Sequence, residues 1–181
     1  MPNWCENTLH VSGDEQLIKK FKEQVRGEGT ALSFASLVPM PKELKGLSSS
    51  PKIVSEKEYD EAVKKAKKEA KKNSMIGLCL PITRKMKKDL MERFGALHWY
   101  DWNIKNWGTK WDVNASLDCE EKNDLTYFFA TAWSPPEAWL RKVSERFLNL
   151  KFVMIYDEPG MGFKGTMEVM AGELNDNCLS Q

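Results

Sequence analysis

The sequence predicts an α+β fold in which two helices cover one face of an antiparallel sheet. The first observation is a period-two alternation of side chains over residues 4–11, which is typical of a strand with one buried face. The second is a Ser-x-x-Glu capping sequence that twice follows a strand pattern and opens a helical one, at Ser12 and at Ser134. The third is a pair of strand-like runs, residues 151–156 and 163–171, joined by a Pro-Gly turn as in a hairpin.

The first half of the chain gives the following elements. Apolar residues at helical spacing from Leu17 to Val25 predict a helix that ends before Gly27. Residues 30–55 contain repeated prolines and a serine run, which indicate a loop. Residues 56–72 are dense in Lys and Glu with a thin apolar stripe, so they predict a peripheral, largely solvated helix.

The second half continues with a helix over residues 83–94 that ends at Gly95. Residues 112–118 alternate as a strand with one solvated face, and residues 125–133 are apolar on both sides, as a central strand is. The helix that follows Ser134 has Pro135 at its first position and Trp139 on its buried side. The tail after residue 175 shows no pattern, and we expect it to be frayed.

Without residues 30–112, the element order is βα, then β, then βα, then ββ. This order is the ferredoxin-like split βαβ plan with one additional C-terminal strand. Right-handed crossovers place both helices on one face of the sheet. Residues 1–181 are therefore expected to form a single domain, and residues 30–112 a helical insertion between the first helix and the second strand. The insertion contains two helices and a tryptophan-rich stretch.

Composition excludes several classes of function. The net charge of +1 argues against a general polyanion binder. No apolar run approaches the ~18–20 residues of a membrane span, and the first residues lack a signal-peptide pattern, so we expect a cytoplasmic protein with no membrane partner. Cys5, Cys79, Cys119 and Cys178 are widely spaced. Since no metal-ligand spacing is present, we expect reduced thiols, no metal and no cofactor.

Residues 98–112 are the most unusual stretch, because they hold Trp99, Trp102, Trp107 and Trp111, four of the seven tryptophans. The rings can pack in the core at a turn that leads into a strand. They can also form a binding wall of flat rings beside cations. From their positions we expect Trp111 to be packed, Trp107 to be at least half buried, and Trp99 and Trp102 to be exposed. The candidate partner-binding residues are Trp99, Tyr100, Trp102, Asn106, Trp107, Lys110, Trp111 and Trp133.

Four segments carry a family resemblance: Met-Pro-Asn-Trp-Cys-Glu-Asn-Thr-Leu at the start, Asn-Trp-Gly-Thr-Lys-Trp-Asp at 106–112, Thr-Ala-Trp-Ser-Pro-Pro at 131–136 and Glu-Pro-Gly-Met-Gly-Phe-Lys-Gly at 158–165. Together they resemble the YubB-like family of phage and conjugative-plasmid proteins. The resemblance runs to about Gly172, except over residues 40–95. It implies a ferredoxin-like domain and a mobile-element origin, and for a protein of that origin we expect action in the host cytoplasm. It implies no activity, cofactor or catalytic residue, and the absence of iron–sulfur cysteine spacing agrees that the term describes topology.

Three functions stay open. The first is a non-enzymatic binding protein, such as a counter-defence factor, that occupies a host protein or sequesters a nucleotide ligand through its Trp/Lys-rich surface. The second is a single-stranded nucleic-acid-binding domain that stacks bases on Tyr127 and Phe129 of the open sheet face. The third is a small hydrolase-type enzyme, although no catalytic signature holds its candidate residues together. Those residues are Cys5, His10, Asp101, Asp112 and Glu158. The oligomeric state has no sequence signal.

Overall fold

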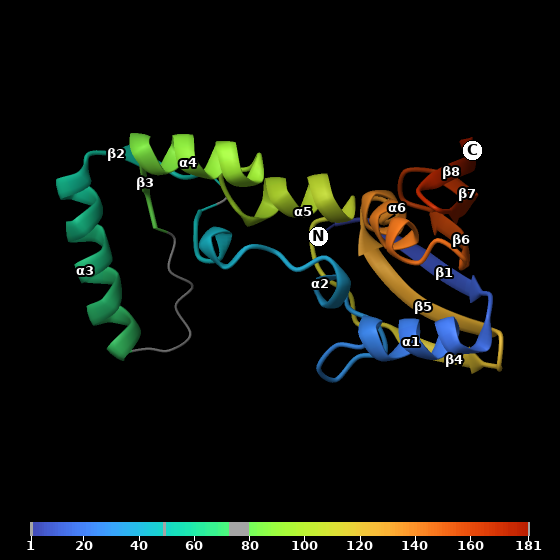
Figure 1. Cartoon of the computed structure of the whole chain (residues 1–181). Coiled ribbons are helices and arrows are strands. Elements are labelled where there is room, and N and C mark those ends of the chain that lie inside the picture. Colours follow the sequence, from blue (N-terminus) through green and yellow to red (C-terminus); the bar gives the residue numbers. More distant parts are fainter. Residues whose placement is uncertain (1, 49, 73–79, 181) are drawn as a thin grey trace. The chain divides into compact units, whose positions relative to one another are not determined.

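The structure is a computed structural model that describes residues 2–48, 50–72 and 80–180 (Figure 1). The chain divides into two units. Unit 1 comprises Met1–Pro39 and Ile104–Gln181, and unit 2 comprises Met40–Asn103. Unit 1 contains the large sheet, and unit 2 is built mainly from helices.

Unit 1 has a six-stranded sheet with the order β4-β5-β1-β6-β7-β8, and every neighbouring pair is antiparallel. The helices α1 (Glu15–Val25) and α6 (Glu137–Arg146) cover one face of it (Figure 1), and the short helix α2 (Phe34–Leu37) follows α1. This is the mixed α+β architecture that the sequence predicted. The strands are β1 (Trp4–Ser12), β4 (Ser116–Glu120), β5 (Asp124–Ala132), β6 (Lys151–Glu158), β7 (Phe163–Met170) and β8 (Glu173–Ser180).

The core of unit 1 lies between the sheet and these helices. Phe21 of α1 is fully buried, and its ring centroid lies 6.3, 5.4 and 5.6 Å from the rings of Tyr127, Phe147 and Phe152. Burial alternates along β1, so Leu9 and the other odd-numbered residues face this core. The even-numbered residues of β1 lie on the opposite face of the sheet, which we call the open face.

One carboxylate joins the chain after α1 to the chain before β4. Asp112 accepts hydrogen bonds from the Ser33 hydroxyl at 2.6 Å and from the backbone N–H groups of Phe34 and Ala35 at 2.6 and 3.3 Å. It also accepts from the N–H of Val113 at 2.9 Å. The first N–H groups of a helix are usually bonded by a capping residue next to them in the sequence. In α2 the carboxylate of the distant Asp112 accepts these hydrogen bonds instead.

Phe34, which Asp112 holds, is the centre of an aromatic contact network. Its ring centroid lies 5.9 Å from Trp107, 5.8 Å from Phe129 and 4.9 Å from Trp139. The indole N–H of Trp139 donates to the Phe34 carbonyl at 3.2 Å, and that of Trp107 donates to the Val38 carbonyl at 2.9 Å. Both buried indoles thus have the partner that a buried N–H requires.

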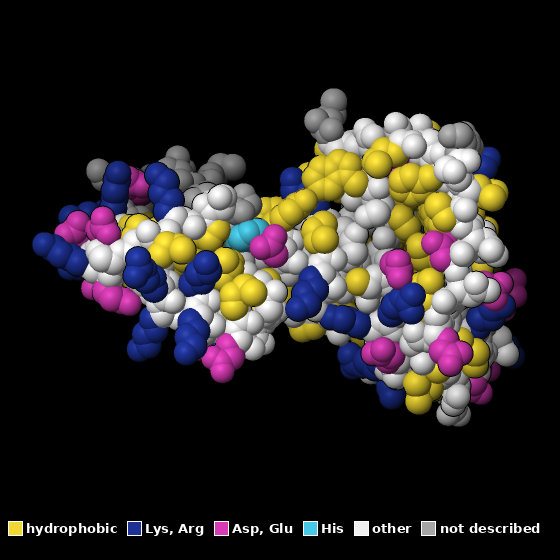
Figure 2. Space-filling view, turned by 90° about the horizontal axis from the view of Figure 1, so that it is seen from above, with side chains coloured by type: hydrophobic (Ala, Val, Ile, Leu, Met, Phe, Trp, Pro, Cys, Tyr) yellow, Lys and Arg dark blue, Asp and Glu magenta, His cyan; other side chains and the backbone are white. Residues whose placement is uncertain are grey.

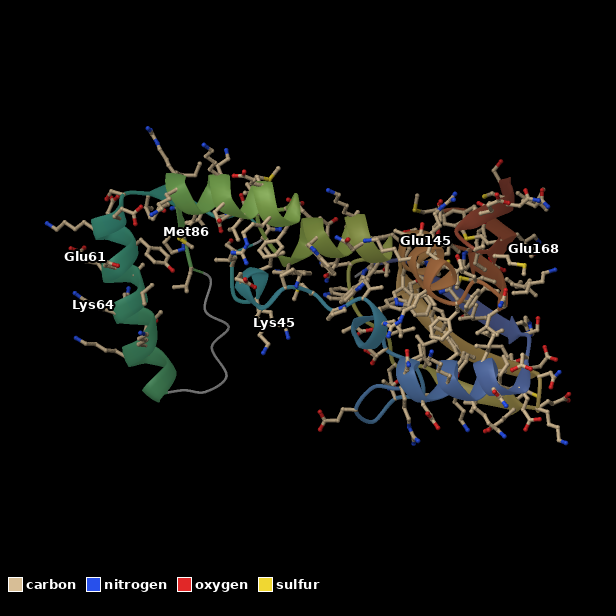
Figure 3. All side chains as sticks on the ribbon, in the orientation of Figure 1. Lys45, Glu61, Lys64, Met86, Glu145 and Glu168 are labelled. Carbon is tan, nitrogen blue, oxygen red and sulfur yellow. The ribbon has the colours of Figure 1, made fainter. Side chains whose placement is uncertain are left out.

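Unit 2 contains a 3-10 helix η1 (Lys42–Leu44), β2 (Ile53–Val54), α3 (Glu56–Lys72), β3 (Ile82–Thr83), α4 (Arg84–Phe94) and the first residues of α5 (Trp99–Trp107). The strands β2 and β3 pair in parallel. The predicted helices over residues 56–72 and 83–94 are confirmed. Thr83 caps α4 by accepting the Met86 N–H at 3.2 Å, and Gly95 ends it with a φ of 61°. Exposed Lys64 points outward from α3 (Figure 3).

Two predicted helix starts are wrong. The N-cap of α1 is Asp14, whose carboxylate accepts from the N–H groups of Gln16 and Leu17 at 2.9 and 3.3 Å, whereas Ser12 is the last residue of β1. Ser134 does not cap α6, because its hydroxyl donates to the Gly108 carbonyl at 2.8 Å. The helix begins only after Pro136, where none of the described side chains caps it.

Three other predicted boundaries differ. Residues 99–107 of the tryptophan-rich run form the helix α5, which was not predicted, and β4 begins at Ser116 rather than at residue 112. The tail is not frayed but forms β8, so the sheet has one more C-terminal strand than predicted. Ala171 and Gly172 join β7 to β8 with φ values of 50° and 84°, the positive values of a tight type I′ hairpin turn. Because β8 is a largely exposed edge strand, it lacks the hydrophobic alternation from which strands are recognised.

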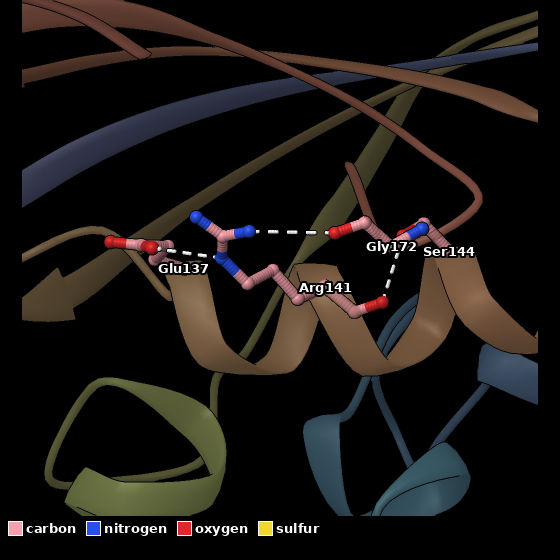
Figure 4. Close-up of polar contacts among 4 residues, drawn as sticks. All are labelled: Glu137, Arg141, Ser144 and Gly172. Atoms are coloured by element: carbon pink, nitrogen blue, oxygen red, sulfur yellow. Dashed lines mark hydrogen bonds and ion pairs between the residues drawn. The ribbon is translucent and has the colours of Figure 1, made fainter. Parts of the chain in front are cut away.

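The β7–β8 turn is attached to α6 (Figure 4). The hydroxyl of fully buried Ser144 donates to the Arg141 carbonyl at 2.8 Å and accepts the Gly172 N–H at 2.9 Å. The Arg141 guanidinium donates to the Gly172 carbonyl at 3.4 Å and pairs with Glu137 at 3.0 Å. These bonds tie the C-terminal hairpin to the helix layer.

Replacing Asp112 with Ala should lower the free energy of unfolding by roughly 2–4 kcal/mol, because several N–H and O–H donors lose a charged acceptor at once. Asp118→Ala is the matched control, since Asp118 is an exposed acid of β4. It should change that free energy by less than about 0.5 kcal/mol. Urea denaturation followed by circular dichroism measures both variants, and equal effects would contradict the role given to Asp112.

Candidate functional site

Three tryptophans and a lysine of unit 1 meet where β1 begins and β5 ends. The rings of Trp4 and Trp111 lie 6.1 Å apart between centroids and are tilted by 34°. The ammonium nitrogen of Lys110 lies 4.3 Å from the ring centroid of Trp111 and 5.3 Å from that of Trp133, within cation–π range. We call these four residues the tryptophan cluster. Trp4 is 48% exposed and Trp111 39%, so the cluster presents flat aromatic surface to solvent.

The pairing of β1 with β5 places two of these rings at the same end of the sheet. Trp4 is the register partner of Ala132, and Trp133 follows directly. Trp133 has a φ of 68°, a left-handed conformation that costs a non-glycine residue roughly 1–2 kcal/mol. Its N–H donates to the Asn3 carbonyl at 3.0 Å. Strain of this kind persists only where the surrounding structure holds it, and it occurs preferentially at functional sites.

Lys110 and Trp111 lie on a loop that β5 holds in place. The hydroxyl of fully buried Thr109 donates to the Ala132 carbonyl at 3.1 Å and accepts the Ala132 N–H at 3.1 Å. Gly108 has a φ of 84°, and a Cβ there would lie only 3.1 Å from the backbone nitrogen of Glu137. The close approach and the positive φ both require glycine. The loop therefore leaves α5 in one defined direction.

The structure brings together only part of the sequence-predicted set. Lys110, Trp111 and Trp133 form the cluster with Trp4, which the sequence prediction missed. Trp107 is buried in the core, and Asn106 accepts a hydrogen bond from Lys142. The remaining predicted residues, Trp99, Tyr100 and Trp102, belong to unit 2.

Within the tryptophan-rich run, two exposure predictions are wrong. Trp111 is 39% exposed rather than packed, because β4 begins only at Ser116 and no strand extends to it. Trp102 is 7% exposed rather than open to solvent, since it lies on a helix with a buried side. The prediction that Trp107 is at least half buried is confirmed at 3% exposure. In unit 2, Trp99 is half-buried and its ring lies edge-on to Tyr100 at 5.8 Å.

The residues predicted to stack bases lie on the wrong face of the sheet. Tyr127 and Phe129 are buried in the core beneath the helices. Phe128, between them, lies on the open face and is 42% exposed. Because side chains alternate along a strand, a shift of one residue exchanges the two faces.

The candidate catalytic residues of unit 1 do not converge on one open site. Cys5 and Glu158 are buried on the helix-covered side, and burial raises the pKa of the Cys5 thiol to about 12. His10 lies on the open face, 3.1 Å from the Thr126 hydroxyl. Asp112 is occupied by its bonds around α2. Asp101 belongs to unit 2, where it lies 3.0 Å from His98.

A hollow of about 560 Å³ lies beside α6 and the C-terminal strands, and hydrophobic side chains gather on this part of unit 1 (Figure 2). Its polar groups pair with one another: Arg141 binds Glu137, and the Tyr156 hydroxyl donates to Asp176 at 2.8 Å. Burial raises the pKa of Tyr156. Gly165 is required here, because a side chain at that position would overlap the Tyr156 hydroxyl. These polar side chains of the hollow are therefore engaged in contacts that stabilise the fold.

Neither a membrane span nor a metal centre is found in the parts of the chain that the structure describes. None of the helices there is long and apolar enough to cross a membrane. No group of three His, Cys, Asp or Glu side chains gathers there as metal ligands.

Comparison with known proteins relates the chain to one fold. Residues 106–181 match a family model described as a ferredoxin-like domain in Api92-like protein. The crystal structure of a protein Api92 from Yersinia pseudotuberculosis is similar, with a TM-score of 0.58 and 13% sequence identity, over 100% of this chain and 99% of that chain. At that identity the likeness concerns the fold alone. No curated protein matches the chain. The predicted ferredoxin-like domain is therefore supported.

The burial of Cys5 leads to a prediction about thiol reactivity. In the folded protein at pH 8, iodoacetamide should modify the exposed Cys119 and Cys178 but not Cys5, because a buried thiol with a raised pKa supplies almost no thiolate. Cys5 should react once denaturant is added, which peptide mass spectrometry measures. Folded-state labelling of Cys5 at the rate of Cys119 would contradict this. Cys79 lies outside the described residues.

Proposed function

We propose that this protein is a non-enzymatic binding protein whose ferredoxin-like unit contacts its partner through the tryptophan cluster. The observation that supports this is the pair of exposed rings, Trp4 and Trp111, with the Lys110 ammonium over the Trp111 ring. Tryptophan is enriched among the few residues that supply most of the binding energy at protein interfaces. The anchored loop and the strained Trp133 hold the surface in place before binding, so less side-chain freedom is lost on association.

The partner that fits this surface best is a host protein. The open face next to the cluster carries the exposed acids Glu6 and Asp157, which would repel the phosphates of a nucleotide ligand or of single-stranded nucleic acid. A protein partner can instead place complementary charges against both Lys110 and these acids. The open face also carries Lys151 and Lys164, and this mixture of charges, with Glu6 nearest to the cluster, favours protein binding over the nucleotide and nucleic-acid alternatives.

As part of this proposal, the protein comes from a phage or plasmid, belongs with the YubB-like proteins, and acts in the host cytoplasm as a counter-defence factor. Three of the segments that carry the YubB-like resemblance also contain the cluster: the first has Trp4, the second Lys110 and Trp111, and the third Trp133. The sheet order further supports a split βαβ plan with a helical insertion over residues 30–112, within which unit 2, residues 40–103, lies.

The binding role of the cluster can be separated from a packing role by three variants. Trp111→Ala should leave the melting temperature within a few degrees and weaken partner binding by roughly 30-fold, the loss expected at an interface hot spot. Trp107→Ala should instead lower the free energy of unfolding by ~3–5 kcal/mol, because Trp107 is buried. Leu148→Ala removes an exposed apolar side chain outside the cluster and should change neither quantity.

The partner for these measurements is captured from extracts of the host cell on immobilised wild-type protein, then purified. Calorimetry with the purified partner gives the affinities, and thermal melting gives the stabilities. An unchanged affinity for Trp111→Ala and Trp4→Ala, with both variants folded, would overturn the proposed binding surface.

A further inference from the structure

Strand register arranges the open face of the sheet into rows that cross β5, β1 and β6. One row contains Phe128, Thr8 and Ile155, which are register partners on neighbouring strands. The adjacent row, one step nearer to the tryptophan cluster, contains Ala130, Glu6 and Asp157. Trp4 follows Glu6 on the same face. The rows are therefore a direct continuation of the cluster along the sheet.

The first row forms a hollow with apolar walls. Phe128 is 42% exposed and Ile155 49%, and the shorter side chain of Thr8 lies between them. The space above these strands is about 500 Å³, and the second row also lines it. Contiguous exposed apolar surface, unlike singly scattered apolar residues, marks interaction sites. The hollow has the size and walls to receive an apolar side chain.

The second row places two carboxylates directly opposite each other. Glu6 and Asp157 are register partners on β1 and β6, and both are exposed. The row continues to the exposed Lys164 of β7, which is the register partner of Asp157, so Asp157 lies between Glu6 and a lysine. Like charges at opposite positions of an antiparallel pair destabilise the sheet. Lys164 can balance only one of the two carboxylates, so a cation supplied from outside and placed beside Glu6 would remove the remaining repulsion.

We propose that this part of the open face is a docking site for a partner segment that presents Lys or Arg beside an apolar side chain. The apolar side chain fills the hollow between Phe128 and Ile155, and the cation lies between Glu6 and Asp157. Charge selects this occupant: nucleic acid would bring phosphates against both carboxylates, and a second copy of the face would bring together four acids. The inference rests on the proposed function, since it gives the chemistry of the partner that also contacts the tryptophan cluster.

The test uses full-length ¹⁵N-labelled protein and two probes, N-acetyl-Phe-Arg-amide and N-acetyl-Phe-Glu-amide, titrated separately by NMR. The arginine probe should shift the amide signals of Thr8, Phe128 and Ile155 and bind at least tenfold more tightly than the glutamate probe. The double variant Glu6→Gln, Asp157→Asn should bind the arginine probe at least tenfold more weakly. Asp118→Asn, an exposed acid on β4, is the control and should bind as the wild type does. Equal binding of both probes, or shifts away from these strands, would overturn the proposal.

A second measurement needs no probe. Because Glu6 faces Asp157 while Asp157 also faces Lys164, the single variant Glu6→Gln isolates the repulsion: it should melt at a higher temperature than the wild type at low salt, and added salt should reduce the difference. A lower melting temperature for the variant would contradict the repulsion. Trp111→Ala separates this proposal from the first one. If that variant weakens partner binding while the wild type shows no preference for the arginine probe, the proposed function stands and the docking chemistry is wrong.

Discussion

The hydrogen bonds to the Asp112 carboxylate are the constraint on which the surface of unit 1 depends. They bind the start of α2 and thereby hold Phe34 among the rings of α5, β5 and α6. The loop before Asp112 is fixed at its other end by Thr109, which is bonded to β5. Lys110 and Trp111 lie between these two anchors. The exposed position of Trp111 is therefore a consequence of these hydrogen bonds, and an exposed ring on such a loop loses little freedom when a partner binds.

Local patterns predicted the elements whose burial follows a simple period. β1, α4 and α6 each place apolar residues on one side, β5 was recognised from a run that is apolar on both sides, and α3 was recognised from its charges. The pattern failed for α5, where the polar Asn103 is buried beside Trp102, and for β8, whose side chains are mostly exposed. The predicted starts of α1 and α6 were wrong for another reason. Ser-x-x-Glu occurs at both places, but strand pairing kept Ser12 in β1 and two prolines delayed α6.

The sequence predicted those residues of the candidate site that stand out within a single stretch of the chain. Lys110 and Trp111 came from the composition of one stretch, and Trp133 from the end of a central strand. Trp4 was missed because its contact with Trp111 depends on the pairing of β1 with β5 and on the direction of the loop after Gly108. The sequence prediction placed Tyr127 and Phe129 on the open face, whereas Phe128 lies there. A shift of one residue along the strand decides which of these rings is exposed.

Aromatic rings, lysines and two acids on one sheet face form a surface with both apolar and charged elements, which suits a protein partner. Hydroxyl-radical footprinting of the protein, free and bound to its captured host partner, tests this most directly. We expect the oxidation rates of Trp4, Trp111 and Phe128 to fall at least fivefold on binding, while exposed Leu148 keeps its rate. Unchanged rates at Trp4 and Trp111, with protection elsewhere in the chain, would show that the partner binds a different surface.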